Sequence, residues 1–106
     1  MDTFETARIL VQRLMDPSHR IAGEDPTTND VTAARRCLAS YERLIDGKKR
    51  LLEACERFAA ESPPEVAQAI RESDIILLEV QLSRFEQRRD YWRLREAELA
   101  GRSDAA

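Results

Sequence analysis

Ser62-Pro63-Pro64-Glu65 stands between two long stretches that are rich in helix-forming residues. Serine as the N-cap, proline at the first helical position and glutamate at the third together predict that a helix begins here. The residue before a proline avoids helical backbone angles, so the preceding helix must end at the same place. A connection this short places two helices antiparallel. The sequence therefore predicts a tight corner between a helix over 30–61 and a helix over 63–100.

The helix predicted over 30–61 has the most regular apolar pattern in the chain. Its apolar residues recur at alternating steps of three and four, the spacing of one helix face, and only Lys48 interrupts them. A second apolar row, seven residues apart, runs beside the first. Three apolar positions per heptad make a face that needs more than one neighbouring helix. The two rows are Val31, Ala34, Leu38, Tyr41, Ile45, Leu52, Cys55 and Ala59, and Cys37, Leu44, Leu51 and Phe58.

The helix predicted over 63–100 changes its apolar pattern along its length. Val66, Ala69 and Ile70 form a narrow stripe, whereas the segment 75–82 is apolar around nearly the whole circumference. Further on, the stripe narrows again to a few aromatic and leucine positions. An antiparallel corner at residue 62 places Phe85 opposite Ser40 and Leu78 opposite Gly47.

The remaining segments complete a single helical domain over 1–101. A short helix is predicted over 3–15, with Phe4, Ala7, Val11 and Leu14 on one face. It is expected to cover the end of the helix pair that carries Tyr41, Phe85 and Trp92. Residues 16–29 form a connection that is long for a helical bundle. The last helix is expected to end near Gly101, leaving 102–106 as a disordered tail.

The fold class that follows is all-α: a short N-terminal helix and a long antiparallel helical hairpin. Two long helices and one short helix cannot enclose the apolar segment 75–82, so the hairpin is expected to dimerise into a helical bundle. The alternative is a compact monomer whose last helix breaks near Ser73-Asp74 and folds over. The residues expected at the dimer interface are Ile75, Ile76, Leu78, Leu82 and Phe85.

Composition is consistent with this interpretation and restricts the cellular setting. The chain has 106 residues, 35% of them charged, with a net charge of −3. No apolar run approaches the ~20 residues that span a bilayer, and the acidic N-terminus does not resemble a signal peptide. Cys37 and Cys55 lie 18 residues apart on one predicted helix, or ~27 Å, too far for a disulfide with each other. A cytoplasmic protein with reduced cysteines and no membrane partner is expected.

Signs of catalytic or metal chemistry are weak. His19 is the only histidine, and it follows a proline within the connection. The sequence contains neither a closely spaced cysteine pair nor a Glu-x-x-His motif, the patterns that would suggest a metal site. Neither cysteine has an evident activating base nearby. We therefore expect a protein that is not an enzyme, with no cofactor and no metal.

Two kinds of partner remain, and the leading expectation is another protein chain. In that case the molecule is a non-enzymatic, homodimeric interaction module, such as an adaptor, a small chaperone or an inhibitor. It could also be a structural subunit that docks into a larger assembly through 75–82. The second kind of partner is nucleic acid, because basic residues accompany three aromatic residues near the C-terminal end. The possible nucleic-acid contacts are Arg84, Arg88, Arg89, Arg93 and Arg95.

Overall fold

The computed structural model describes residues 3, 5–6 and 20–105. It contains helix α2 (Val31–Ala60), helix α3 (Pro64–Ile70), the π-helical segment η1 (Arg71–Ile75) and helix α4 (Ile76–Ala105), and the described residues include no strand. The prediction of an all-α protein is confirmed. Thr3, Glu5 and Thr6 are helical. The rest of the helix predicted over 3–15, and His19, lie outside the described residues.

Helix α2 matches the prediction for 30–61 to within one residue at each end. Asp30 caps its start, because the carboxylate accepts a hydrogen bond from the Thr32 amide at 2.9 Å. At its end the Ser62 hydroxyl donates to the Phe58 carbonyl at 2.6 Å. The predicted role of Ser62 as N-cap of the next helix is therefore wrong. Pro63 occupies that position, and the helix begins at Pro64 without a side-chain cap.

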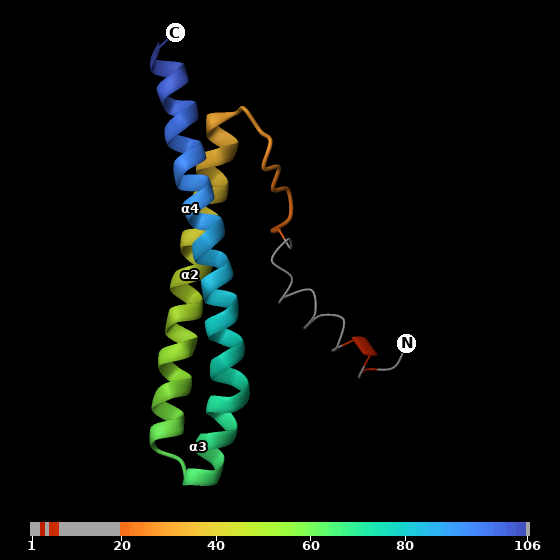
Figure 1. The fold of residues 1–106 in the computed structure, drawn as a ribbon, viewed down its shortest axis with the longest axis vertical. Helices are drawn as coiled ribbons and strands as arrows, with labels where there is room; N and C mark the ends of the chain where they lie inside the picture. The colour runs from red at the N-terminus through yellow and green to blue at the C-terminus, as the bar shows by residue number, and fades with distance from the viewer. Residues whose placement is uncertain (1–2, 4, 7–19, 106) are drawn as a thin grey trace.

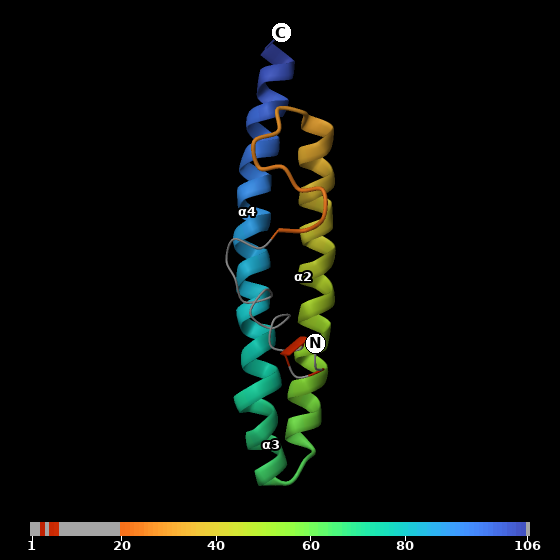
Figure 2. The same ribbon diagram turned by 90° about the vertical axis from the view of Figure 1, so that its right-hand side faces the viewer.

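After the corner at 61–63, the chain runs back alongside α2 as α3, η1 and α4 in succession (Figures 1 and 2). Tyr41 on α2 faces Phe85 on α4, with ring centroids 6.0 Å apart. This pairing is one residue from the predicted register, which put Phe85 opposite Ser40. Further towards the C-terminus, Arg35 and Glu96 join the same two helices through an ion pair at 2.9 Å.

The π-helical segment η1 was not predicted. It contains Ser73 and Asp74, where a break had been considered as the alternative, but the chain continues in the same direction through it (Figure 1). The wider π turn brings Ile70 and Ile75, five residues apart, to the same buried face. The apolar stripe predicted before this segment is also wrong in part. Ala67 and Ile70 are buried, whereas Val66 and Ala69 are exposed.

The C-terminal boundary also differs from the prediction. Helix α4 continues through Gly101 to Ala105, where a helix end and a disordered tail were expected. A glycine ends a helix when it adopts a left-handed conformation with positive φ. Among the described glycines only Gly23 has positive φ, so Gly101 does not end the helix in this way. Gly101 is exposed and keeps helical backbone angles, so it costs helix stability without ending the helix.

Two apolar clusters hold the helices together. The larger one joins α2 and α4 towards the end that carries the connection, and Trp92 and Tyr41 are its largest fully buried side chains. Ile21 of the connection packs against it. The smaller cluster lies at the corner end and joins Ala59 of α2 to Ala67, Ile70 and Ile75. The side chains at the corner end are therefore smaller, and less apolar surface is buried there.

Candidate functional site

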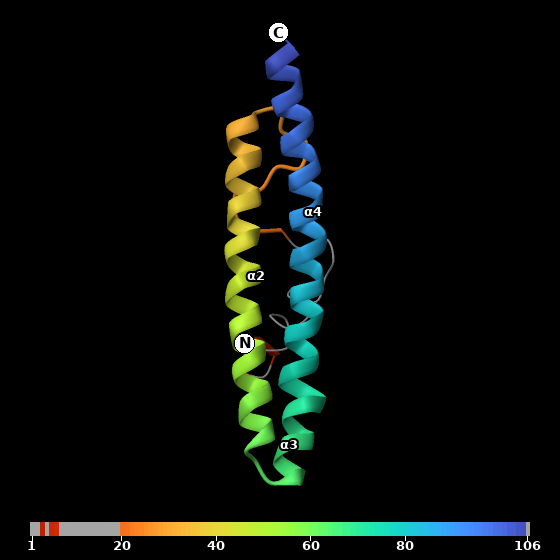
Figure 3. The ribbon, with the colours of Figure 1, turned by 90° about the vertical axis from the view of Figure 1, so that its left-hand side faces the viewer.

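The connection over residues 20–30 lies across α2 and α4 on one face of the helix pair (Figure 2), while the opposite face is bare of it (Figure 3). Two turns give it its shape. In the first, the Glu24 amide donates to the Ile21 carbonyl at 3.2 Å, and Gly23 has a φ of +80°, which a type II turn requires at its third position. In the second, the Thr28 amide donates to the Asp25 carbonyl at 3.1 Å, with Pro26 as the second residue.

Glu24 anchors this connection to both helices. Its side chain is fully buried and its carboxylate accepts hydrogen bonds from the Tyr41 hydroxyl, the Arg88 guanidinium and the Trp92 indole, the last at 2.7 Å. Tyr41 comes from α2, whereas Arg88 and Trp92 lie one turn apart on α4. We call these four residues the Glu24 cluster. Because it satisfies a buried carboxylate with one cation and two neutral donors, the cluster fixes the connection in a single position.

A second set of contacts holds the rest of the connection against α4. The Tyr91 hydroxyl donates to the Pro26 carbonyl. The Arg95 guanidinium donates to the Thr28 carbonyl at 2.9 Å and to the Asn29 side chain at 2.8 Å. The Arg88 guanidinium also lies over the Tyr91 ring, 4.8 Å from its centroid. Side chains one turn apart along α4 thus bind successive parts of the connection.

The environment of the Glu24 cluster favours its charged form. Burial by itself would raise the pKa of Glu24, but hydrogen bonds from Arg88, Tyr41 and Trp92 and the charge of Arg88 outweigh it and lower the pKa. Burial and the hydrogen bond to Glu24 raise the pKa of Tyr41, so its hydroxyl remains a donor. The ion pair between Glu24 and Arg88 is therefore the stable state at neutral pH.

The lowered pKa of Glu24 predicts how stability depends on pH. A carboxyl group whose pKa is lower in the folded state stabilises the fold above its unfolded pKa of about 4.3, and this contribution is lost as the pH falls through the folded value. We expect the free energy of unfolding to decline below about pH 5, and to decline less steeply in a Glu24→Gln variant. Urea unfolding of both proteins between about pH 7 and pH 3 measures the free energy of unfolding at each pH. If this free energy declined equally with pH in the two proteins, the prediction would be contradicted.

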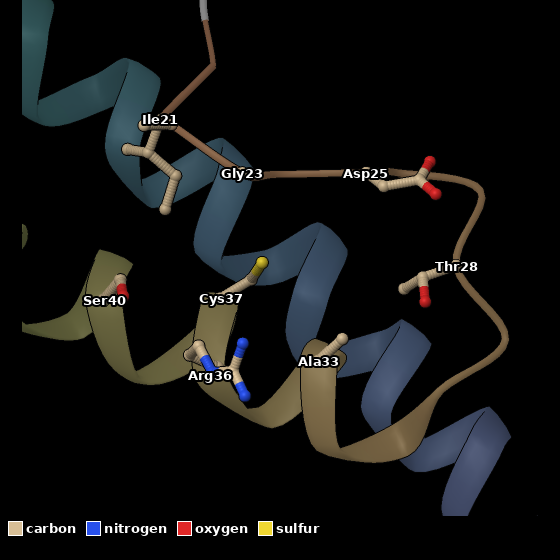
Figure 4. A pocket seen from close by; sticks show the side chains of 9 residues that line it. Ile21, Gly23, Asp25, Thr28, Ala33, Arg36, Cys37 and Ser40 are labelled. Carbon is tan, nitrogen blue, oxygen red and sulfur yellow. The ribbon is translucent and has the colours of Figure 1, made fainter.

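A small pocket lies between the connection and α2, and Figure 4 shows the residues around it. Its lining includes the Cys37 thiol, the Arg36 side chain and Asp25. Burial, followed by the negative charge of Glu24, raises the pKa of Cys37. A nucleophilic cysteine needs the opposite shift, so the pocket favours a protonated and unreactive thiol. Both cysteines are free.

The arginines considered for nucleic-acid binding do not form one exposed surface. Arg88 and Arg95 bind the connection, and Arg84 is buried and lies 5.1 Å from the Phe85 ring centroid. Arg89 pairs with its neighbour Asp90 at 3.0 Å, and Arg93 lies 3.9 Å from Glu42 of α2. Three of the five arginines are therefore used to hold the fold together.

The residues expected at a dimer interface are also divided. Ile75 and Phe85 are buried within the chain, and Leu82 packs against the larger cluster. Leu78 is half-buried, and Ile76 is 52% exposed. Two residues outside the prediction, Leu51 and Phe58 on α2, are at least as exposed, at 52% and 61%. The sequence placed them on the second apolar row but did not show that this row is left uncovered.

Sequence reasoning missed Glu24 altogether. Its partners Tyr41, Arg88 and Trp92 are 17, 64 and 68 residues away in the chain, so no local spacing reveals the cluster. The available signal was weaker: a tyrosine and a tryptophan on predicted core faces need acceptors for their polar groups when buried. A connection of unusual length beside them was the place to look for an acceptor.

Within the described ranges, no three His, Cys, Asp or Glu side chains come together in a way that could hold a metal ion. The helices described are also not long and apolar enough to cross a membrane. No protein-family model, no curated protein and no solved structure matches the chain.

Proposed function

We propose that the chain is a non-enzymatic protein–protein interaction module, in which an antiparallel helical hairpin presents apolar side chains to another chain. The proposal rests on one apolar row of α2, because the exposure of its side chains increases along the helix. Leu44 is half-buried and packs with the larger cluster beside the connection, whereas Leu51 and Phe58, one and two heptads further on, are 52% and 61% exposed. The apolar row therefore continues along α2 beyond the part that the connection borders.

Exposed apolar side chains also occur on α3 and α4, which run back alongside α2. Val66, Ile76 and Val80 are exposed, although each lies within a few residues of a buried isoleucine. Burying one large apolar side chain contributes roughly 1.5–3 kcal/mol, so several of them together favour association with another surface. The Glu24 cluster at the other end, whose buried carboxylate accepts three hydrogen bonds, supports a rigid scaffold with one covered half and one half available for binding.

Self-association is the simplest form of this interaction. Ile76 and Val80 lie one turn apart on α4, so they share a face that a second copy can cover in a two-fold dimer. Leu78 is half-buried and lies ~200° around α4 from Ile76, so it does not share this face. We propose a homodimer through this face, with the buried Ile75 and Phe85 supporting it from within each chain.

Replacing Ile76 with aspartate tests this homodimer. Each copy would lose a buried isoleucine and gain a charge at the interface, which predicts a dissociation constant raised by at least about tenfold. Light scattering coupled to size-exclusion chromatography at several concentrations measures the mass, and it also distinguishes a dimer from a larger assembly. Leu51→Asp is the matched control, because Leu51 has the same exposed fraction as Ile76, 52%, and lies on α2, outside the proposed α4 face. A wild-type protein that is monomeric at tens of micromolar would overturn the homodimer.

A further inference from the structure

The exposed face of α2 has an internal repeat of seven residues. Residues four apart on a helix are neighbours along one ridge, and three such ridges on α2 have the same composition: an arginine, a small residue and a large apolar residue. We call them rows 1, 2 and 3. They are Arg36-Ser40-Leu44, Arg43-Gly47-Leu51 and Arg50-Ala54-Phe58.

The rows differ in what covers them. Row 1 borders the connection, since Ser40 and Leu44 line a shallow groove together with Ile21 and Ala22. Arg36 borders the pocket to which Asp25 also contributes. The chain segment that borders row 1 thus contributes apolar residues, Ile21 and Ala22, and one acidic residue, Asp25. Rows 2 and 3 are exposed at all six positions.

Gly47, the small residue in the middle of row 2, is not needed for packing within the part of the chain that the structure describes. A Cβ atom added to Gly47 would meet nothing within 4 Å, so this glycine does not permit close packing of α2 against any described part of the chain. A mid-helix glycine costs about 1 kcal/mol relative to alanine. Beside Leu51, however, a small residue provides a hole into which a side chain of a neighbouring helix can pack.

The arginines specify the charge of that neighbour. Arg50 is paired with Asp46 at 3.0 Å, but its side chain remains 78% exposed. Arg43 and Arg57 have no ion-pair partner among the residues that the structure describes. A second copy packed on the same rows would not supply carboxylates from those rows: in parallel packing the arginines would face each other, and in antiparallel packing they would lie against Leu51 and Phe58, which is unfavourable in both cases. A partner helix with glutamate or aspartate at heptad spacing would pair with them.

We propose that rows 2 and 3 of α2 form a docking site for an acidic amphipathic helix of a partner protein. The partner's backbone lies over Gly47 and Ala54, its apolar side chains contact Leu51 and Phe58, and its carboxylates pair with Arg43 and Arg50. The site spans residues 43–58, or ~22 Å, which corresponds to about four turns of the partner helix. The inference rests on the proposed role as an interaction module but not on the homodimer, which uses α4.

An anionic membrane surface also attracts a helix face with arginine and apolar residues. The pattern of the rows favours a helix instead. A lipid surface gains only from apolar area, so alternation with glycine and alanine would weaken membrane binding, whereas it suits helix packing. The net charge of −3 further disfavours binding of the whole chain to anionic lipids.

The test uses two synthetic helical peptides with the same apolar heptads, one flanked by glutamate and the other by lysine, and vesicles of phosphatidylglycerol and phosphatidylcholine. Binding to the full chain is followed by fluorescence anisotropy of labelled peptide and by co-sedimentation with vesicles. We expect the glutamate peptide to bind and the lysine peptide to bind at least about tenfold more weakly, with the preference reversed in an Arg43→Glu, Arg50→Glu variant. Lys49→Glu is the control for charge, because Lys49 lies ~100° around the helix from Arg50.

Gly47→Leu separates the two kinds of surface. Filling the hole should weaken binding of the glutamate peptide by about tenfold or more, while adding apolar area should strengthen any vesicle binding. Equal binding of both peptides, binding of neither, or vesicle binding that Gly47→Leu enhances would overturn the inference. A homodimer that persists in the Arg43→Glu, Arg50→Glu variant leaves the proposed self-association intact, so the two proposals fail separately.

Discussion

Replacing Glu24 with glutamine is expected to lower the free energy of unfolding by roughly 3 kcal/mol, the lower end of the range for breaking a buried ion pair. The Glu24 side chain is fully buried and that of Arg88 is 14% exposed, so the lost carboxylate leaves a largely buried guanidinium charge without compensation. The hydrogen bonds from Tyr41 and Trp92 would have to adapt to an amide that offers only one acceptor oxygen. Urea unfolding followed by circular dichroism measures the change.

A double-mutant cycle tests whether the uncompensated charge of Arg88 causes the loss of stability. Combining Glu24→Gln with Arg88→Met removes the uncompensated charge, so the double variant should lose less stability than the sum of the two single variants. The effect should also be local at first. Exchange of the Glu24 and Thr28 amide hydrogens, which close the two turns of the connection, should accelerate more than exchange in the middle of α2. Strictly additive losses would show that Glu24 and Arg88 do not act as a pair.

The parts of the fold that local sequence encodes were predictable. The Asp30 cap, the regular apolar rows and the two prolines at 63 and 64 are sufficient to give α2 its bounds within one residue at each end. The corner was predicted for the same reason, although Ser62 turned out to bond backwards to Phe58. A serine next to a helix end can satisfy either neighbouring helix, and its sequence context does not distinguish them.

The π turn and the Glu24 cluster could not be predicted, because both depend on packing between distant segments. Ser73 and Asp74 have low helix propensity, but this does not by itself indicate a π turn, and only the buried positions of Ile70 and Ile75 reveal the extra residue. The apparent apolar surplus around 75–82 follows from this change of phase. Ile75 points into the smaller cluster while Ile76 is exposed, so the segment is neither fully buried nor fully available.

The same limitation explains the arginines near the C-terminal end. A sequence shows a basic and aromatic cluster, which is typical both of nucleic-acid binding and of a structural network. The structure adds the position of the connection, which supplies acceptors for Arg88 and Arg95. On α2, by contrast, the repeat of arginine, small and apolar residues is visible in the sequence. Its meaning depends on knowing that rows 2 and 3 stay exposed.

Replacing Trp92 with alanine is expected to have the largest effect on stability, about 3–5 kcal/mol. Trp92 is 0% exposed, lies in the larger cluster, donates to Glu24 and packs edge-on against Tyr91 with ring centroids 5.2 Å apart. Its removal therefore leaves a cavity and takes one donor from a buried carboxylate. Because it is the only tryptophan, unfolding of the variant must be followed by circular dichroism.

Two further variants divide this loss into its parts. Trp92→Phe keeps most of the apolar volume but removes the indole donor, so it should cost about 1–3 kcal/mol, the penalty for a hydrogen bond lost at a buried acceptor. Leu94→Ala changes a neighbouring side chain that is 64% exposed, and should alter stability by no more than about 0.5 kcal/mol. If Trp92→Ala cost no more than Leu94→Ala, then the larger cluster could not be what holds the connection, α2 and α4 together. The rigid half on which the proposed binding surfaces depend would then lack its physical basis.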